Sequence, residues 1–341
     1  MRLPSGFSAS IGLFVGSLLF IWASGCSKSN SLVIYTSVDR DYAEPIITTF
    51  QKQHPDRTVK FIADSELTKT TGLYNRIQAE KKNPQADVFW NSEILRTVQL
   101  KQVGLLEPYL SPAAKDIPDV YKDPQGYWTG FSVRARVMII NTQRVPQSET
   151  PCSFPDLNNM KYRALIGMAN PEFGTTSDHM VALYQNWGVT RFKLFFGLVK
   201  QNGLKILPGN ASVRDAVAAG TLAYGLTDTD DAYAAIDEKK PVRMAFLDQA
   251  TDGTLIIPNT VALLKGSPSP ANGKLFIDYL LSPEVEEQLA KSRAKQIPVR
   301  PSVERPQGVP DLASIKALKV NYEELAKNLE PCLELIRILL P

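Results

Sequence analysis

Three carboxylates stand close together in the second half of the chain. Asp228, Asp230 and Asp231 occur within four residues, directly after the mostly apolar run 222–226. Carboxylates at this spacing repel one another unless a cation or hydrogen-bond donors offset their charge. The cluster therefore predicts a site for an ammonium group or a metal ion. The alternative is that Asp230 or Asp231 only caps the helix expected to follow.

Hydroxyl side chains begin two other expected helices. Thr70 and Thr71 precede a glycine, and Thr175 and Thr176 follow one. A helix N-terminus presents unpaired N–H groups and partial positive charge, and hydroxyls add further donors. These positions suit a phosphate, phosphonate or carboxylate, with plain helix capping as the alternative. A ligand that used both the hydroxyls and the carboxylates would be a small zwitterion such as an aminophosphonate.

Further polar residues follow predicted strands and are expected to line the same site. Arg134 and Arg136 alternate with apolar residues, so both lie on one face of their strand. We expect these two arginines to pair with acids of the protein, and the alternative is that they pair with an anionic ligand. The other candidate ligand contacts are Thr36, Ser37, Asp39, Trp90, Asn91, Glu93, Asn210, Arg214 and Asn259. For Trp90, packing is the alternative, and Asn259 is also a candidate hinge residue.

The composition excludes several classes of function. The 341 residues include 38 Lys and Arg against 35 Asp and Glu, so the formal charge is only +3 and nucleic-acid binding by net charge is disfavoured. Two histidines leave little material for histidine-based catalysis or a multi-histidine metal site. No nucleophile elbow, zinc-protease, phosphate-loop or dinucleotide motif occurs. No catalytic residue and no cofactor is therefore expected.

The first 25 residues differ from the rest of the chain. Arg2 is their only charge, and a mostly apolar run from Phe7 to Trp22 ends in small residues just before Cys26. This run is shorter than the ~20 residues of a membrane-spanning helix and is typical of a secretory signal. The segment resembles a bacterial lipobox. We predict a signal peptide over 1–25, an acylated Cys26 and a tether over 26–31, with an uncleaved membrane anchor as the alternative.

Export changes the interpretation of the two remaining cysteines. Cys152 and Cys332 would lie in an oxidising compartment, where two thiols can form a disulfide. Neither has a neighbouring cysteine or a metal-site spacing. We hypothesise a Cys152–Cys332 bridge, and the alternative is two unreactive thiols.

The elements that must position these residues alternate between strand and helix. Short apolar strands are predicted at 32–35, 59–62 and 87–90, with amphipathic helices between them. The alternation restarts at 164–168, beyond a long extended stretch at 128–141. Such alternation predicts an α/β protein with parallel strands. We predict two lobes, 32–145 with 259–341 and 146–258, whose facing strand ends make a ligand cleft that closes by hinge motion.

Four runs of residues carry a resemblance to a known family. They are Leu-Val-Ile-Tyr-Thr-Ser at 32–37, Ala-Asp-Val-Phe-Trp-Asn at 86–91, Phe-Ile-Asp-Tyr-Leu-Leu-Ser-Pro-Glu at 276–284 and Ile-Pro-Val-Arg-Pro at 297–301. The chain resembles bacterial extracellular solute-binding proteins of ABC importers, in particular the ferric-iron-binding type. The resemblance implies a type II periplasmic-binding-protein (Venus flytrap) fold and a monomer without catalysis. It also implies a periplasmic or extracytoplasmic location, with an ABC permease and its ATPase as partners.

The resemblance leaves the ligand open. Iron-binding members carry two adjacent tyrosines, whereas none of the 12 tyrosines here is adjacent to another. Where the pair is expected, the chain has Tyr224-Gly225-Leu226-Thr227-Asp228. Hard ferric iron favours anionic oxygen ligands, so Asp228, Asp230 and Asp231 are the candidate metal ligands. Ferric iron and a small anionic, phosphorylated or zwitterionic solute both stay possible, and a ligand sensor or a secreted α/β enzyme are the alternative functions.

Overall fold

A computed structural model describes residue 1 and residues 30–64 and 69–340. The predicted signal peptide, Cys26 and most of the tether lie outside the described residues. Among the helices that are described, none is both long enough and apolar enough to cross a membrane.

The first lobe is built on three parallel strands that follow one another in the chain. Both neighbours of β1 run parallel to it. The strands are β1 (Ser31–Thr36), β2 (Thr58–Ala63) and β3 (Val88–Asn91), and the helices are α1 (Arg40–Gln53), α2 (Thr71–Ala79) and α3 (Leu95–Gln102). In α1 the buried residues Ala43, Ile46, Ile47 and Phe50 recur at helical spacing. The predicted strand–helix alternation is confirmed here.

The second lobe repeats this arrangement. Strands β7 and β8 flank β6, and both run parallel to it. The strands are β6 (Ile166–Ala169), β7 (Lys205–Leu207), β8 (Tyr224–Asp228) and β9 (Val242–Phe246), and the helices are α4 (Gly174–Gln201), α5 (Asn210–Ala218) and α6 (Thr229–Asp237). Gly188 has φ 74°, and this left-handed backbone conformation divides α4 into two segments.

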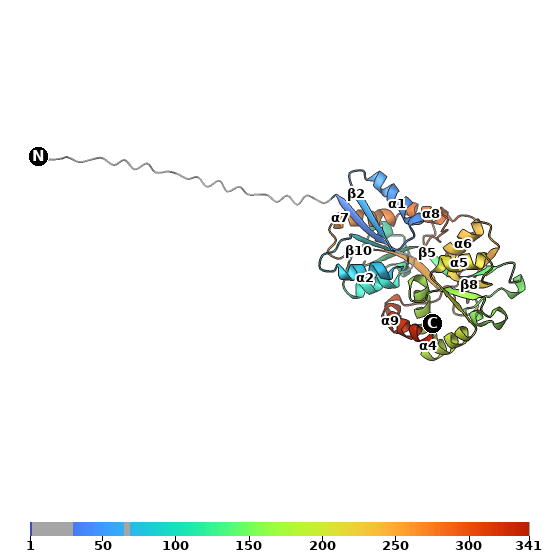
Figure 1. Cartoon of the computed structure of the whole chain (residues 1–341). Coiled ribbons are helices and arrows are strands. Elements are labelled where there is room, and N and C mark those ends of the chain that lie inside the picture. The colour runs from blue at the N-terminus through green and yellow to red at the C-terminus, as the bar shows by residue number, and fades with distance from the viewer. Residues whose placement is uncertain (2–29, 65–68, 341) are drawn as a thin grey trace.

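Two long strands join the lobes. The first residues of β5 (Thr129–Asn141) pair with β10 (Ile256–Leu264), and its last residues pair with β8 and β9. Since β10 also pairs with β3, the order is β2-β1-β3-β10-β5-β8-β6-β7. Figure 1 shows β5 and β10 crossing the centre of the molecule, between the two groups of helices. The result is a two-lobed α/β fold.

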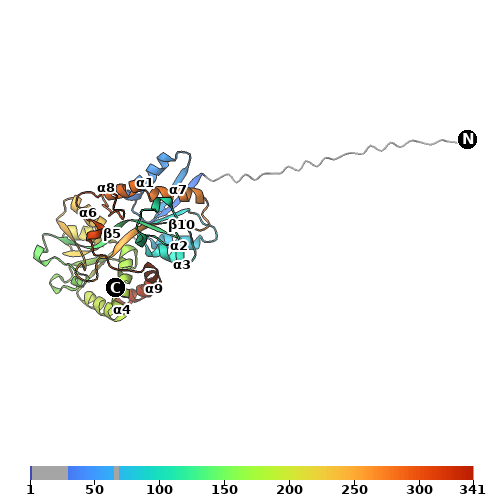
Figure 2. The same cartoon turned by 180° about the vertical axis from the view of Figure 1, so that it is seen from behind.

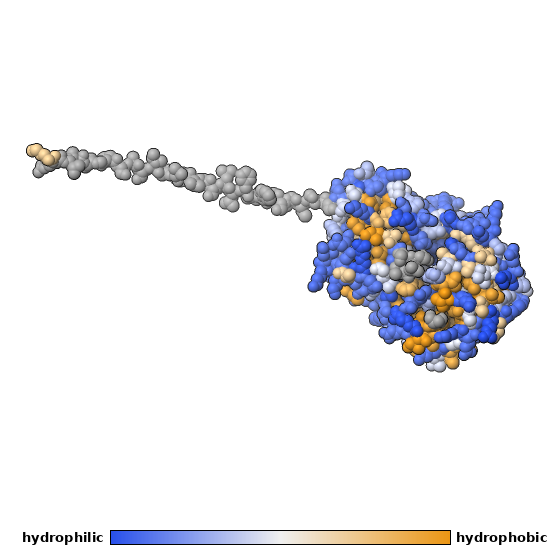
Figure 3. Space-filling view, viewed as in Figure 1, coloured by the Kyte–Doolittle hydropathy of each residue, from blue (hydrophilic) through white to orange (hydrophobic). Residues whose placement is uncertain are grey.

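The C-terminal helices complete both lobes. They are α7 (Pro270–Leu280), α8 (Pro283–Lys291) and α9 (Tyr322–Leu339). Helix α9 packs against α4 of the second lobe and also against α3 of the first, and it lies beside α4 in both views (Figures 1 and 2). Hydrophilic residues dominate the face seen in Figure 3, and apolar residues gather over its lower part, where α4 and α9 lie.

Short elements occupy the connections. The two-residue strand β4 (Leu106–Glu107) pairs with β10. Single 3-10 turns occur at Pro112–Ala114, Asp119–Tyr121, Gln147–Glu149, Phe154–Asn158, Met160–Tyr162 and Leu312–Ser314.

The predicted Cys152–Cys332 bridge is not formed. Both residues are free thiols in the structure. Cys152 is exposed in the connection after β5, whereas Cys332 is fully buried on the inward face of α9. The buried thiol behaves as a small apolar side chain of the core.

Gly225 of β8 lies in a closely packed part of the second lobe, and its replacement tests that packing. A Cβ at Gly225 would lie 2.6 Å from Val213 of α5 and 2.7 Å from the carbonyl oxygen of Gly167 in β6. Gly225→Ala should lower the free energy of unfolding by about 1–3 kcal/mol, because strand and helix must separate. Urea denaturation measures this loss.

The control is Gly197→Ala in α4, where a Cβ meets nothing within 4 Å. This substitution should leave stability unchanged or raise it by up to about 1 kcal/mol, because alanine loses less backbone entropy in a helix. Equal effects at the two positions would contradict the packing described for β8.

Candidate ligand-binding site

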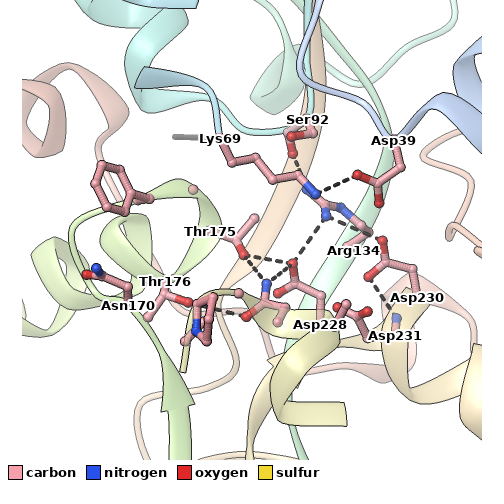
Figure 4. Close-up of a pocket in the computed structure, with 17 residues that line it drawn as sticks. Asp39, Lys69, Ser92, Arg134, Asn170, Thr175, Thr176, Asp228, Asp230 and Asp231 are labelled. Atoms are coloured by element: carbon pink, nitrogen blue, oxygen red, sulfur yellow. Dashed lines mark hydrogen bonds and ion pairs between the residues drawn. The ribbon is translucent and has the colours of Figure 1, made fainter. Parts of the chain in front are cut away.

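A polar pocket lies where three strands of the second lobe end. At the carboxyl ends of β6, β7 and β8 the helices α4, α5 and α6 begin, and these helix starts form one wall of the pocket. Asp39, Lys69 and Ser92 of the first lobe and Arg134 of β5 form the other wall (Figure 4). This is the position at which open α/β sheets bind ligands.

Two of the helices present uncapped N-termini to the pocket. The residues preceding α4 and α5 are Phe173 and Gly209, and neither has a side chain that can accept a hydrogen bond from the first helical turn. The N–H groups of those turns are therefore available to an anion. Thr175 and Thr176 add hydroxyl groups, and both line the pocket on the α4 side (Figure 4).

Asp228 is the centre of a buried charge network. Arg136 lies opposite Asp228 in the pairing of β5 with β8 and donates a hydrogen bond to it at 2.7 Å. Arg134 donates to the other carboxylate oxygen at 3.2 Å, and the Thr175 hydroxyl donates at 2.7 Å. Burial raises the pKa of Asp228, but the two arginine charges and the Thr175 hydrogen bond together outweigh burial. The pKa therefore lies below its usual range.

The other two aspartates of this cluster are poorly compensated. Burial raises the pKa of Asp231 well above its usual range, and the charges of Asp230 and Asp228 raise it further. Arg214 on α5 donates to Asp231 at 3.4 Å. Burial also raises the pKa of Asp230, although Arg134 opposes this effect. A positively charged group in the pocket would relieve this repulsion.

Arg134 connects the two walls. One of its terminal nitrogens donates to the carbonyl oxygen of Ser92 in the first lobe, and the other faces Asp228 and Asp230 in the second lobe. Lys69 forms an ion pair with Asp39 at 2.6 Å within the first lobe (Figure 4). The expectation that Arg134 and Arg136 pair with acids of the protein is confirmed.

The structure brings together seven of the sixteen predicted ligand contacts. The lining residues are Asp39, Thr175, Thr176, Asn210, Asp228, Asp230 and Asp231. Arg214 lies behind them, against Asp231. The other eight lie outside this lining: Thr36, Ser37, Thr70, Thr71, Trp90, Asn91, Glu93 and Asn259.

These other residues support the first lobe and the strand crossing. Trp90 is fully buried and packs near Phe131 and Phe276. Ser37 donates to Asn91 at 2.5 Å. Asn259 sits at a bulge in β10, where it donates to Gln296 at 2.7 Å. Ser37 and Asn91 are thus satisfied inside the protein, whereas Trp90 Nε1, Asn259 Oδ1 and Thr70 Oγ1 have no hydrogen-bond partner among the described groups.

Sequence reasoning missed four polar or aromatic wall residues. Lys69, Ser92, Asn170 and Phe173 all line the pocket. Each is next to, or a few residues from, a residue that the sequence singles out, such as Thr70 or Thr175. The sequence locates the right loops here, but the direction of each side chain depends on how the loop turns.

The geometry does not favour a metal ion on the aspartates. No group of three or more His, Cys, Asp and Glu residues in the described part of the chain is arranged to hold a metal. Asp228, Asp230 and Asp231 each face an arginine, which a cation would have to displace. No tyrosine is among the described residues that line the pocket.

Comparison with known proteins adds a family match. The family model described as "Bacterial extracellular solute-binding protein" matches residues 85–328. The major ferric iron-binding protein of Neisseria meningitidis serogroup A is 26% identical over 305 residues, covering 83% of this chain and 89% of that protein. A periplasmic protein of Salmonella paratyphi A named for binding 2-aminoethylphosphonate is 22% identical over 276 residues, covering 73% and 78%.

The fold also matches solved structures. Iron-bound HitA from Pseudomonas aeruginosa superposes with a TM-score of 0.82 at 21% identity, covering 91% of this chain and 99% of that one. This likeness confirms the predicted two-lobed periplasmic-binding-protein fold.

Replacing Asp228 tests the buried charge network. Asp228→Asn leaves Arg136 buried without its counter-charge, which should cost about 3–5 kcal/mol of unfolding free energy at pH 7. The folded-state pKa of Asp228 is lowered, so its stabilisation is present above its unfolded pKa of about 3.9 and is lost as the pH falls through the folded value. The difference between wild type and variant, measured by urea denaturation, should therefore shrink below about pH 4.

Asp215→Asn is the matched control. Asp215 also pairs with an arginine, Arg214, but its side chain is 68% exposed. This substitution should change stability by less than about 1 kcal/mol. A comparable loss of stability in both variants would show that burial does not determine how much the Asp228 ion pair contributes to stability.

Proposed function

We propose that this chain, which belongs to the bacterial extracellular solute-binding protein family, captures a small organic zwitterion between its lobes and delivers it to the permease of an ABC importer. Members of this family bind solutes for transport, so the chain is not an enzyme. The ligand we favour carries a phosphonate, phosphate or carboxylate at one end and an ammonium group at the other.

The observation that carries this proposal is the two-ended chemistry of the pocket. On one side the uncapped starts of α4 and α5, with Thr175 and Thr176, offer donors to an anion. On the other side lie Asp230, which is buried, and Asp231, which is partly buried, and a cation would stabilise both acids. A zwitterion satisfies both sides at once, whereas a simple anion or cation satisfies only one.

Ferric iron is the competing ligand and fits the pocket less well. The Neisseria meningitidis relative is named for ferric iron, which favours anionic oxygen donors. Here the buried carboxylates already face guanidinium groups, and the pocket lining contains no tyrosine among the described residues. The relative from Salmonella paratyphi A is named for 2-aminoethylphosphonate, which has the anionic and ammonium ends that this pocket suits.

Lobe closure supplies the binding mechanism. The ligand first contacts the helix starts of the second lobe. Closure then adds Lys69 and Ser92 from the first lobe, and the closed form is selected because only it makes both sets of contacts. The monomer in this closed form then docks on the permease.

We also propose that the periplasmic protein is held at a membrane by lipid on Cys26. The support is the short apolar run that ends in Ala23-Ser24-Gly25 immediately before this cysteine. Cleavage there would make Cys26 the N-terminal residue, and residues 27–30 would separate the lipid from β1.

Ligand binding is tested with 2-aminoethylphosphonate and two fragments of it. Isothermal titration calorimetry should show binding of 2-aminoethylphosphonate, and at least tenfold weaker binding of ethylphosphonate and of ethanolamine, because each fragment loses one charged contact. Asp231→Asn should lower the affinity for 2-aminoethylphosphonate by about 10- to 100-fold, while the affinity for ethylphosphonate should change little. Thr176→Val should lower the affinity for both phosphonates.

A thermal-shift panel with ferric citrate, sugar phosphates and amino acids provides the comparison. Binding of ferric citrate with a visible charge-transfer colour, and no response to any zwitterion, would overturn the assignment. If a different zwitterion binds in place of the phosphonate, the proposed class of ligand stands and only the identity of the compound changes.

The lipid anchor is tested by Cys26→Ser in a bacterial host that processes lipoproteins. Wild-type protein should fractionate with membranes and take up labelled palmitate, because the thiol is the acylation site. The Cys26→Ser variant should do neither. Cys152→Ser is the control and should behave as wild type, since Cys152 lies in an exposed connection of the folded lobe. Membrane association of both variants would rule out lipid on Cys26.

A further inference from the structure

The second half of α4, residues 189–201, carries apolar side chains on its inner face and on its outer face. On the inner face Phe192 and Phe196 are fully buried in the core. On the outer face Leu194 is 66% exposed and Leu198 is 49% exposed. A surface helix of a globular protein normally turns polar residues outward. The packing of the second lobe therefore does not account for these two leucines.

The exposed leucines border an open groove between this helix segment and the 3-10 turn Phe154–Asn158. Trp187 and Phe195 also line the groove, and their rings pack edge to face with centroids 5.2 Å apart. The guanidinium of Arg191 lies 4.4 Å from the centre of the Trp187 ring. The groove shares no lining residue with the ligand pocket. It is thus a second, largely apolar surface feature of the second lobe.

The charges beside this groove are positive. Residues 179–214 contain five Lys and Arg and no Asp or Glu. Arg191, Lys193 and Lys200 are exposed, and none of them forms an ion pair with a described residue. The acid of the opposite turn, Asp156, accepts hydrogen bonds from the backbone N–H groups of the two residues before that turn. The three cations of the helix are therefore available to an anionic partner.

Exposed leucines beside cations suit the surface of an anionic phospholipid membrane. Interfacial helices bury Leu, Phe and Trp at the boundary between headgroups and acyl chains, while Lys and Arg contact the headgroup phosphates. A second copy of this chain fits less well. In a twofold contact between two copies the same surface meets itself, so the cations of both copies would face one another. Charge complementarity thus favours a lipid surface over self-association.

We propose that the outer face of α4, formed by Arg191, Lys193, Leu194, Leu198 and Lys200, docks on a membrane that contains anionic phospholipid. The two leucines enter the headgroup region, and the three cations contact the phosphates of the lipids. The helix lies along the membrane surface and does not cross it. The apolar area over α4 in Figure 3 is consistent with such a surface. The contact is separate from the ligand pocket and does not require lipid on the chain.

The experiment measures vesicle sedimentation of the chain from residue 26 onward with Cys26→Ser, so that the protein carries no lipid. It should sediment with vesicles of equal parts phosphatidylglycerol and phosphatidylcholine. Its affinity for vesicles of phosphatidylcholine alone should be at least about tenfold lower, because each Lys or Arg near an anionic surface strengthens binding by roughly fivefold. Added salt should lower the affinity for the anionic vesicles, since it screens these contacts.

Two double variants separate the charged contribution from the apolar one. Lys193→Gln with Lys200→Gln should lower the affinity for anionic vesicles by about 20-fold, because two cations are lost. Leu194→Ser with Leu198→Ser should lower it by at least about tenfold, because less apolar surface enters the membrane. All four residues are exposed, so both variants should fold, and thermal melting checks this.

The controls are Lys239→Gln with Lys240→Gln and, separately, Leu110→Ser, which replace exposed residues away from the groove. Both should bind anionic vesicles as the parent chain does. Protein that stays in solution with anionic vesicles, or equal binding by groove variants and controls, would overturn the proposal.

A dimer in sedimentation-velocity ultracentrifugation that Leu194→Ser with Leu198→Ser dissociates, together with no binding to vesicles, would assign the groove to a second copy and would also overturn the proposal. No solute is present in these measurements, so the outcome is independent of which ligand the pocket binds.

Discussion

The buried pairing of Asp228 with Arg136 is the interaction on which the site depends. The two residues face each other across β5 and β8, at the point where the shared sheet passes from one lobe into the other. An unpaired charge at a fully buried position would be strongly destabilising, so the pair constrains the register of the two strands. The same carboxylate accepts from Thr175 and Asn210, which ties the starts of α4 and α5 to the end of β8.

Charge balance in the cleft follows from this network and limits the ligand. Four carboxylates and four cationic side chains gather there, namely Asp39, Asp228, Asp230 and Asp231 with Lys69, Arg134, Arg136 and Arg214. Burial raises the pKa of Asp230 and of Asp231, so these two acids are the ones that a positively charged end of the ligand would stabilise. A zwitterion adds no net charge and still finds a separate partner for each of its ends.

The contacts between the lobes are of two chemical kinds, helix packing and a charged link. Helix α9 packs on both α3 and α4, and Arg134 links Ser92 to the aspartates at any pH at which those acids are ionised.

Local sequence pattern was enough to predict the order of the elements, the two-lobed α/β class and the loops that carry the site. Residues 32–35 form an apolar run, and the buried residues of α1 recur at helical spacing. Buried positions in strands and helices can therefore be recognised from the local pattern of apolar residues. Only the tertiary structure decided which polar residues face the ligand and which satisfy the interior. Thr175 and Ser37 both follow strands, yet the first lines the pocket and the second is bonded to Asn91. The separation of Cys152 from Cys332 was equally beyond local pattern. Such contacts depend on how elements far apart in the chain pack together, and the types and spacing of neighbouring residues do not specify that packing.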